Sequence, residues 1–168
     1  MEKIHHFNIF RTHYTVDDNL INQIYNLKHL DLGTPKSNIG GWHSKTFTPY
    51  KDYYNGRYKW TTNIIESLTS IVRLTWPNVI FNRAWFNMSY PGGTNRWHDH
   101  GSHPIVSVLY IKTPNPCSPI EFRQDSELFQ YQPNAGDFLV FPGTLEHRVL
   151  ENESTDERIS MAINFSDS

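Results

Sequence analysis

Two histidines in the segment from Trp97 to His103 have the spacing of metal ligands. His98 and His100 are two residues apart, so on an extended backbone both side chains point the same way and Asp99 turns away. Neutral imidazole binds iron, copper, zinc or nickel. The segment is equally typical of a solvated polar loop without a ligand, so the rest of the chain has to decide between the two interpretations.

A further histidine, His147, follows an apolar run and a turn. Residues 137–141 are typical of a buried strand, Pro142-Gly143 of a turn, and a new strand over 145–150 then contains His147. Strand ends of a β-barrel meet at its mouth, which is a common place for binding sites. His147 can therefore approach a histidine from another strand end, although a half-exposed histidine of an ordinary sheet is the alternative.

The strand predicted over residues 157–165 alternates between an apolar face and a polar one. The polar face carries Arg158, Ser160, Ala162 and Asn164. If residues 150–157 close a hairpin, His147 lies opposite Ser160 and diagonal to Arg158, within reach of both. An arginine beside a hydroxyl suits a carboxylate, through charge-assisted and bidentate hydrogen bonds. An ordinary strand with its polar face in water is the alternative.

Two helices are predicted ahead of most of the strands. The first begins after Thr15, which can cap it, and its apolar periodicity ends between Leu30 and Gly33. The second runs from about Thr61 to Leu74 and has a single apolar stripe. Both helices are therefore expected to cover a sheet and to carry no chemistry.

From residue 78 onward, short β-prone runs alternate with turns. The predicted strands are 79–90, 105–112, 120–123, 128–131, 137–141, 145–150 and 157–165, with an outer strand over 3–12. Strands at this spacing favour an antiparallel sandwich or jelly-roll barrel. We predict one α+β domain over 1–168, with a strand, two helices and an aromatic arm in 1–77 and a jelly-roll core in 78–168.

The aromatic arm is a segment without periodicity, residues 36–58. Its aromatic residues include Trp42, Tyr50, Tyr53, Tyr54 and Tyr58. A loop of this length is usually functional or disordered, and so many aromatic side chains argue against disorder. Two interpretations of this segment remain, a lid over the substrate and an ordered arm on the surface. Trp42, together with Trp85 and Asn87 on the strand before the histidines, is a candidate substrate contact.

Composition and charge restrict the classes of partner. With 38% hydrophobic and 14% aromatic residues, the 168-residue chain has a globular rather than a disordered composition. The net charge of −2 includes no basic block, so nothing indicates nucleic acid or an anionic membrane as partner. Cys117 is the one cysteine, which fits a reducing compartment, and no apolar run could span a membrane. We expect a cytoplasmic protein, with a homodimer as one option.

The order of these features resembles the Fe(II)/2-oxoglutarate-dependent oxygenases, especially a small branch of bacterial and phage proteins described as putative 2OG-Fe(II) oxygenases. The matching positions are His98-x-His100, Ser107, Tyr110, Gly136, Phe141-Pro142, His147, Arg158-x-Ser160 and Asn164. The stretch from Asn38 to Ser44 also resembles the N-terminal part of that branch. The ordered set is more specific than any one of its pieces.

The resemblance implies a double-stranded β-helix with Fe(II) at its open end and 2-oxoglutarate as cosubstrate. His98 and His147 would be iron ligands, and Arg158 would pair with the distal carboxylate of 2-oxoglutarate. Three further residues would complete the cofactor site: Ser160, Tyr110 and Asn164. The implied reaction is hydroxylation of a small molecule or peptide, with release of succinate and carbon dioxide.

The third iron ligand departs from the pattern of the family. The family places Asp or Glu two residues after the first histidine, where this chain has His100. We expect His100 to be the third ligand. The alternatives are Asp99, brought in by a bulge, and a carboxylate from elsewhere such as Glu121. Three neutral ligands would leave more positive charge on the metal than two histidines and a carboxylate do.

A metal-binding cupin is the alternative function. Residues 92–100 and 136–147 match much of the two cupin motifs, and a cupin would have the same jelly-roll fold. It would act without 2-oxoglutarate, as an isomerase, an oxygen-only dioxygenase or a binding module. The glutamate of the first cupin motif is missing, because Pro104 and Ile105 stand where it is expected. A cupin also gives no reason for Arg158.

Overall fold

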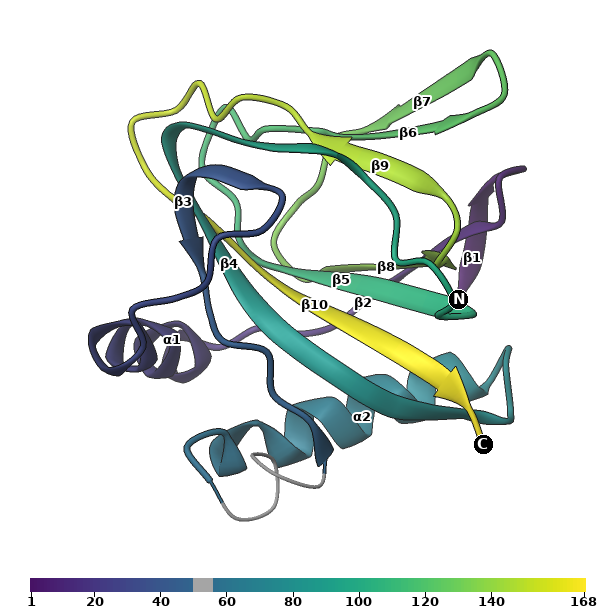
Figure 1. Cartoon of the computed structure of the whole chain (residues 1–168), viewed down its shortest axis with the longest axis horizontal. Coiled ribbons are helices and arrows are strands. Elements are labelled where there is room, and N and C mark those ends of the chain that lie inside the picture. The colour runs from purple at the N-terminus through teal and green to yellow at the C-terminus, as the bar shows by residue number, and fades with distance from the viewer. Residues whose placement is uncertain (50–55) are drawn as a thin grey trace.

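The computed structural model describes residues 1–49 and 56–168 and shows two antiparallel sheets with two helices on one side (Figure 1). The first part contains β1 (Glu2–His5), β2 (Ile9–His13), α1 (Asp18–Leu30), β3 (Asn38–His43), η2 (Lys59–Thr61) and α2 (Thr62–Arg73). The second part contains β4 (Val79–His98), β5 (Ile105–Lys112), β6 (Ile120–Gln124), β7 (Glu127–Tyr131), β8 (Asp137–Pro142), β9 (Glu146–Val149) and β10 (Arg158–Asp167). The predicted α+β jelly-roll is confirmed.

The strands follow the order β1-β2-β8-β5-β10-β4-β9-β6-β7, and β3 pairs with β4. Strand β4 takes part in both sheets, because residues 79–89 pair with β10 whereas Asn95 and His98 pair with β9. One sheet thus runs from β1 to the first part of β4. The other sheet comprises the end of β4 with β9, β6 and β7, and the two sheets face each other.

The strand predicted over residues 79–90 is too short, since β4 continues through residues 91–98 as one bent strand. Gly92 has a φ of +80°, which a residue with a side chain rarely adopts. A Cβ on Gly93 would collide with the carbonyl oxygen of Gly40 on the neighbouring strand. The glycines therefore allow a sharp bend and a close backbone approach, whereas their sequence signal is that of a turn.

The hairpin expected across residues 150–157 is also wrong. Strand β9 pairs with β4 and β6, and β10 pairs with β4 and β5, so β4 lies between them. The connecting loop crosses from one sheet to the other instead of turning back. Its backbone pairs with the bend of β4, because Gly92 N–H donates to Asn152 O at 2.7 Å and Asn152 N–H donates to Gly93 O at 2.9 Å.

The helices pack on the sheet that contains β10, as predicted. The apolar face of β10 is fully buried in one core cluster with both helices, and it consists of Ile159, Met161, Ile163 and Phe165. A second cluster fills part of the space between the sheets and includes Phe7, Val106 and Phe141. Helix α1 is capped by Asp17 rather than by the expected Thr15, since the Asp17 carboxylate accepts the Leu20 N–H at 2.8 Å.

Part of the expected aromatic arm is a strand rather than a loop. Strand β3 pairs with β4, and Gly41 lets the two backbones approach, because a Cβ there would collide with the Met88 carbonyl oxygen. Tyr58 is buried, and its hydroxyl donates to the Asp31 carboxylate at 2.9 Å. Three tyrosines of the expected arm lie outside the described residues: Tyr50, Tyr53 and Tyr54.

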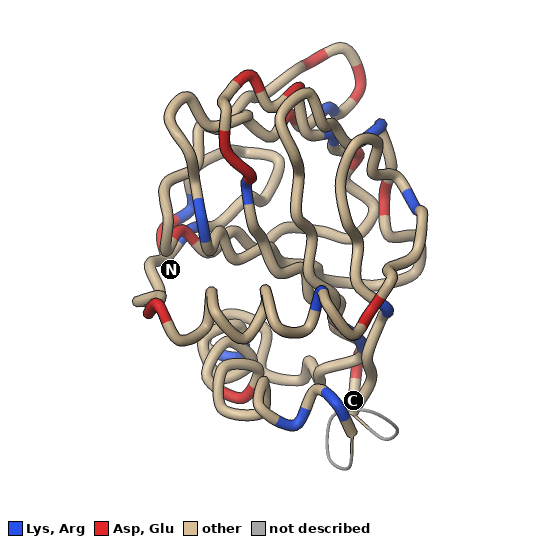
Figure 2. The backbone as a smooth tube through the Cα atoms, turned by 90° about the vertical axis from the view of Figure 1, so that its left-hand side faces the viewer, with Lys and Arg blue, Asp and Glu red and all other residues tan. Residues whose placement is uncertain are grey.

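The charge pattern agrees with the sequence analysis. In the view of Figure 2, basic and acidic residues are interspersed along the chain, without a continuous basic stretch. No helix among the described residues is long and apolar enough to cross a membrane.

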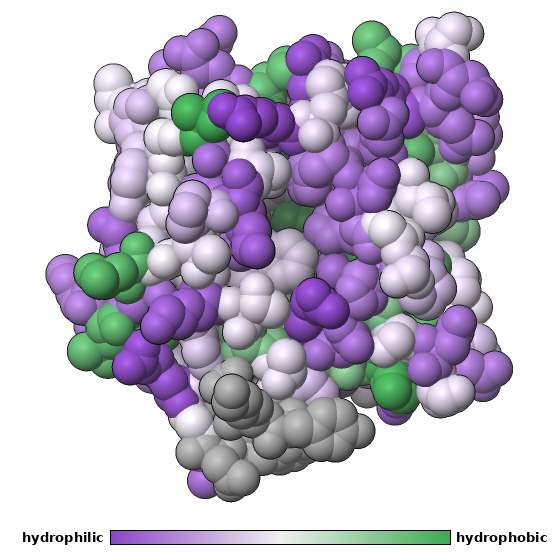
Figure 3. Space-filling view, viewed as in Figure 1, coloured by the Kyte–Doolittle hydropathy of each residue, from purple (hydrophilic) through white to green (hydrophobic). Residues whose placement is uncertain are grey.

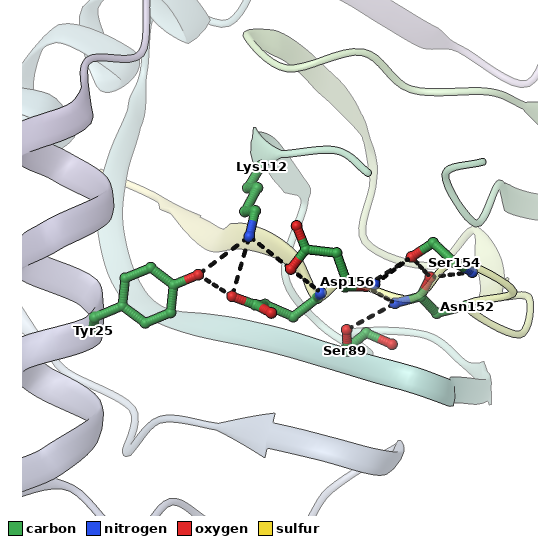
Figure 4. Close-up of polar contacts among 7 residues, drawn as sticks. Tyr25, Ser89, Lys112, Asn152, Ser154 and Asp156 are labelled. Carbon is green, nitrogen blue, oxygen red and sulfur yellow. Dashed lines mark hydrogen bonds and ion pairs between the residues drawn. The ribbon is translucent and has the colours of Figure 1, made fainter. Parts of the chain in front are cut away.

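A buried asparagine in the loop between β9 and β10 holds the bend of β4 (Figure 4). The side chain of Asn152 is buried, and its Nδ2 donates to the carbonyl oxygens of Ser89 at 3.0 Å and Asp156 at 2.8 Å. Its Oδ1 accepts a hydrogen bond from Ser154 Oγ at 2.7 Å. One side chain thus connects Ser89, the last residue of β4 that pairs with β10, to Asp156, two positions before β10.

Charged residues extend this cluster to α1 and β5 (Figure 4). Lys112 Nζ lies 2.9 Å from the Asp156 carboxylate and 3.2 Å from the Glu157 carboxylate. The Tyr25 hydroxyl donates to Glu157, which joins the helix to the same group. These contacts hold the chain immediately before Arg158, where the polar face of β10 begins.

We expect Asn152→Ala to lower the free energy of unfolding by about 3 kcal/mol, because it removes several hydrogen bonds and leaves buried carbonyl groups without donors. Glu153→Ala, at an exposed position in the same loop, is the matched control and should change stability little. Urea denaturation measures both. Equal stability of the two variants would show that Asn152 does not hold the bend.

Candidate metal centre

The facing sheets enclose a cavity of about 430 Å³, which contains most of the predicted site residues. These are His98, His100, His147, Arg158, Ser160, Tyr110, Asn164, Trp85 and Asn87. The face viewed in Figure 3 is hollowed near its middle and has mostly hydrophilic residues around the hollow. The polar face of β10 points into the cavity, as its alternation predicts, while its apolar face lies under the helices.

Three histidines converge in this cavity. His98 and His147 are directly opposite each other in the ladder between β4 and β9. His100 Nε2 lies 3.2 Å from His147 Nε2, and one ring nitrogen of each of the three histidines lies within 4.8 Å of the others. This spacing lets the three nitrogens surround a single metal ion.

Backbone carbonyls fix the rings of two of these histidines. His98 Nδ1 lies 2.7 Å from the Arg96 carbonyl oxygen, and His147 Nδ1 lies 2.9 Å from that of Leu145. A carbonyl oxygen only accepts, so Nδ1 carries the proton in both rings and Nε2 keeps its lone pair. Such outer hydrogen bonds orient histidine ligands in metal sites.

His100 is placed differently, because it lies beyond the end of β4 rather than on an extended strand. Its backbone N–H donates to the Gly143 carbonyl at 2.8 Å, which brings it against the turn between β8 and β9. Its ring stacks on His147 at 5.1 Å and on Trp85 at 5.7 Å between centroids. A Cβ on Gly143 would collide with the carbonyl oxygen of His103. The close approach of the chain after β4 to this turn therefore requires glycine at position 143.

Burial keeps the three rings neutral. It is the main cause that lowers the pKa of His98, and it lowers the pKa of His147 well below the usual value. Burial, followed by the charges of His98 and His103, lowers the pKa of His100 to about 4. Near pH 7 the cluster therefore offers unprotonated nitrogens, which is the form that binds metals.

Neither alternative carboxylate joins the group of three ring nitrogens. Asp99 lines the cavity, but it is exposed and its carboxylate accepts the N–H of Gly101 at 2.8 Å. Glu121 forms an ion pair with Arg148 at 2.6 Å and does not line the cavity. Among the described residues, the group of potential metal ligands at this place contains only the three histidines. The geometry thus favours the arrangement with His100.

A buried arginine lies in the same cavity. Arg158 is only 4% exposed, and no carboxylate in the described part of the chain forms an ion pair with it. Its guanidinium lies over the ring of Tyr110, 4.8 Å from the centroid. An unpaired buried charge is costly, so the site is suited to an anion that would compensate it.

Several buried polar atoms of the cavity, one of them on Arg158, lack a hydrogen-bond partner. They are Arg158 Nε, Tyr110 Oη, Ser107 Oγ, Asn87 Oδ1 and Asn164 Oδ1. Buried polar atoms are nearly always hydrogen-bonded in proteins, and exceptions gather where a ligand binds. The predicted site residues do not include Ser107 or Gly143. In the sequence, Ser107 is marked only by the family resemblance, and Gly143 only by its position in a Pro-Gly turn.

The structure does not place Trp42 in the cavity. Trp42 is buried in the core beside the helices, and its Nε1–H donates to the Asp31 carbonyl at 2.9 Å. The position of Trp42 gives no support to the prediction that it contacts substrate, because β3 turns this side chain into the core. Trp85 does line the cavity, but His43 and His100 stack on it at 5.4 and 5.7 Å, which leaves mainly the indole edge for a ligand.

A family model described as putative 2OG-Fe(II) oxygenase matches residues 122–164, which include His147 and the first part of β10. No curated protein matches the chain. The matched family implies Fe(II) and 2-oxoglutarate as cofactors.

Solved structures of similar fold include a prolyl-4-hydroxylase from Pseudomonas putida, with 15% identity, a TM-score of 0.62 and coverage of 95% of this chain and 92% of that one. A 2OG-Fe(II) family oxidoreductase from Burkholderia pseudomallei has 11% identity and a TM-score of 0.71, over 94% and 84%. A prolyl hydroxylase from Trichoplax adhaerens has 10% identity and a TM-score of 0.68, over 95% and 83%.

At these identities the structures establish the fold, and the family model adds a match over β6 to β10. The resemblance predicted from the sequence is confirmed: the chain is similar to the Fe(II)/2-oxoglutarate-dependent oxygenases in its fold and in the sequence of residues 122–164.

Proposed function

We propose that this protein is a non-haem Fe(II)- and 2-oxoglutarate-dependent dioxygenase that hydroxylates a small molecule or a peptide. The observation that carries the proposal is a buried, unpaired arginine in the same cavity as a cluster of three neutral histidines. The histidines suit a divalent metal and the arginine suits a dicarboxylate. A 2-oxoglutarate molecule would link the two.

His98, His100 and His147 would hold the iron. Their nitrogens are close enough to bind one ion, and the rings are neutral and fixed by backbone carbonyls or by stacking. Three protein ligands on one side leave further positions open for the cosubstrate. When bound, Fe(II) and 2-oxoglutarate would supply the chemistry that uses molecular oxygen to hydroxylate a C–H bond: one oxygen atom goes to the substrate and the other to succinate, and carbon dioxide is released.

Arg158 would bind the distal carboxylate of 2-oxoglutarate. Its guanidinium can donate two parallel hydrogen bonds, and its burial strengthens them because little water competes. Ser160 lies two residues further along the same face of β10, and Tyr110 lies directly opposite Ser160 on β5. Both hydroxyls would therefore donate to the same carboxylate.

Two asparagines would bind further polar groups of the cosubstrate or substrate. Asn164 lies on β10, and Asn87 lies opposite Ser160 on β4. Both side-chain oxygens are buried without a donor, so a ligand with hydroxyl or amide N–H groups would satisfy them. The prime substrate would enter beside Trp85, which lines the cavity next to His100. The Trichoplax adhaerens relative was solved with a peptide fragment, which makes a peptide one option for this chain.

Arg158→Ala should weaken 2-oxoglutarate binding by about 100-fold or more, because a buried carboxylate would lose its charged partner. The measurement is an anaerobic titration with Fe(II) and 2-oxoglutarate, followed through the metal-to-ligand absorption band. Arg83→Ala, at an exposed position of the same cavity, is the control and should keep the affinity. A cupin without 2-oxoglutarate would bind metal and develop no band, which would overturn the proposal.

His147→Ala should weaken Fe(II) binding at this centre by at least about 100-fold, because the most buried ligand is lost while the fold remains. Anaerobic calorimetric titration with Fe(II) measures the change. His103→Ala serves as the matched control, since His103 lines the cavity but lies outside the three-histidine group. If His147→Ala bound Fe(II) as tightly as the unmodified protein, the metal would have to lie elsewhere.

A further inference from the structure

The barrel has a seam where its two edge strands face each other. Strands β1 and β7 are the two ends of the strand order, and within the described residues β1 pairs only with β2 and β7 only with β6. Figure 1 shows their hairpins on the same side of the molecule. No backbone ladder joins the two edges, so side chains make the connection.

Two histidines and a glutamate meet at this seam. His6 Nε2 lies 2.9 Å from one carboxylate oxygen of Glu127, and His5 Nε2 lies 3.8 Å from the other. The two imidazole rings are 4.2 Å apart between centroids. One potential ligand atom from each residue lies within 4.8 Å of the others, as in the cluster of central histidines.

His5, the half-buried member of this group, is held in place by aromatic contacts. The ring of His5 stacks on Phe129 of β7 at 4.1 Å and meets the edge of Phe7 at 4.3 Å. Phe7 is buried in the core between the sheets, and it belongs to the turn that also contains His6. The apolar contacts therefore fix the hairpin turn against β7, so that little ordering would be needed for a ligand to bind.

We propose that His5, His6 and Glu127 form a second divalent-metal site, of the zinc type, that closes the seam between β1 and β7. Zinc binds combinations of imidazole and carboxylate, with water in any remaining position. The single negative charge of Glu127 would partly balance the ion, which the neutral central cluster cannot do. The site is independent of the proposed oxygenase function.

The ring of His5 can present Nε2 to a metal ion at this seam. The N–H of Phe7 donates to His5 Nδ1 at 3.3 Å. Metal binding through Nε2 requires the ring proton to lie on Nδ1, so the hydrogen bond from the Phe7 N–H to Nδ1 is lost. The ion replaces it with bonds that connect both edges.

The first measurement is equilibrium dialysis against Zn²⁺ with elemental analysis of the bound metal. The seam variant, His6→Ala with Glu127→Gln, should bind one ion fewer per chain than the unmodified protein. His29→Ala, which removes an exposed histidine of α1, is the control and should bind as many ions as the unmodified protein. A seam variant that binds the same number of ions as the unmodified protein would overturn the proposal.

The second measurement separates this site from the central cluster. In a His147→Ala background, Zn²⁺ at about 100 times its dissociation constant should raise the midpoint of thermal unfolding by about 5 °C or more, because it binds the folded state across the seam. The rise should vanish when the seam variant is added to that background. A rise of equal size in both proteins would place the stabilising ion elsewhere, and no rise in either would exclude the site.

Discussion

Strand β4 belongs to both sheets, and this continuity places the candidate metal centre. Before the bend its residues pair with β10, and after the bend His98 pairs with His147 on β9. The bend depends on two glycines and on Asn152, whose backbone and side chain bind the residues on either side. One covalent strand thus fixes the distance between the sheet that carries Arg158 and the sheet that carries His147.

The interior of this barrel contains groups that suit charged ligands but have no charged partner within the described part of the protein. Arg158 is buried without a carboxylate partner among the described residues, and the cluster of three histidines brings no negative charge. Without a bound ligand, such a cavity costs folding free energy, because the buried arginine loses its hydration and gains no counter-ion. A metal ion bound together with a dicarboxylate would satisfy both groups at once. The two unusual features therefore have one explanation.

Local patterns predicted the faces of strands well and their long-range pairing poorly. Alternation in residues 157–165 identified both the core face and the cavity face of β10. The pair His98 and His100 was identified as well, although the extended backbone assumed for it ends at His98. The hairpin across 150–157 was wrong because those residues bind the bend of β4, a contact distant in sequence. The inward direction of Trp42 was missed because an aromatic residue of an aperiodic segment carries no sign of which way its strand faces.

A crystal structure of the protein grown without oxygen, with Fe(II) and 2-oxoglutarate, tests the central claim most directly. The account predicts iron bound by His98, His100 and His147, with the distal carboxylate of 2-oxoglutarate on Arg158. Anomalous scattering would locate the iron without reference to the protein ligands. Iron bound away from these histidines, or 2-oxoglutarate bound without contact to Arg158, would contradict it.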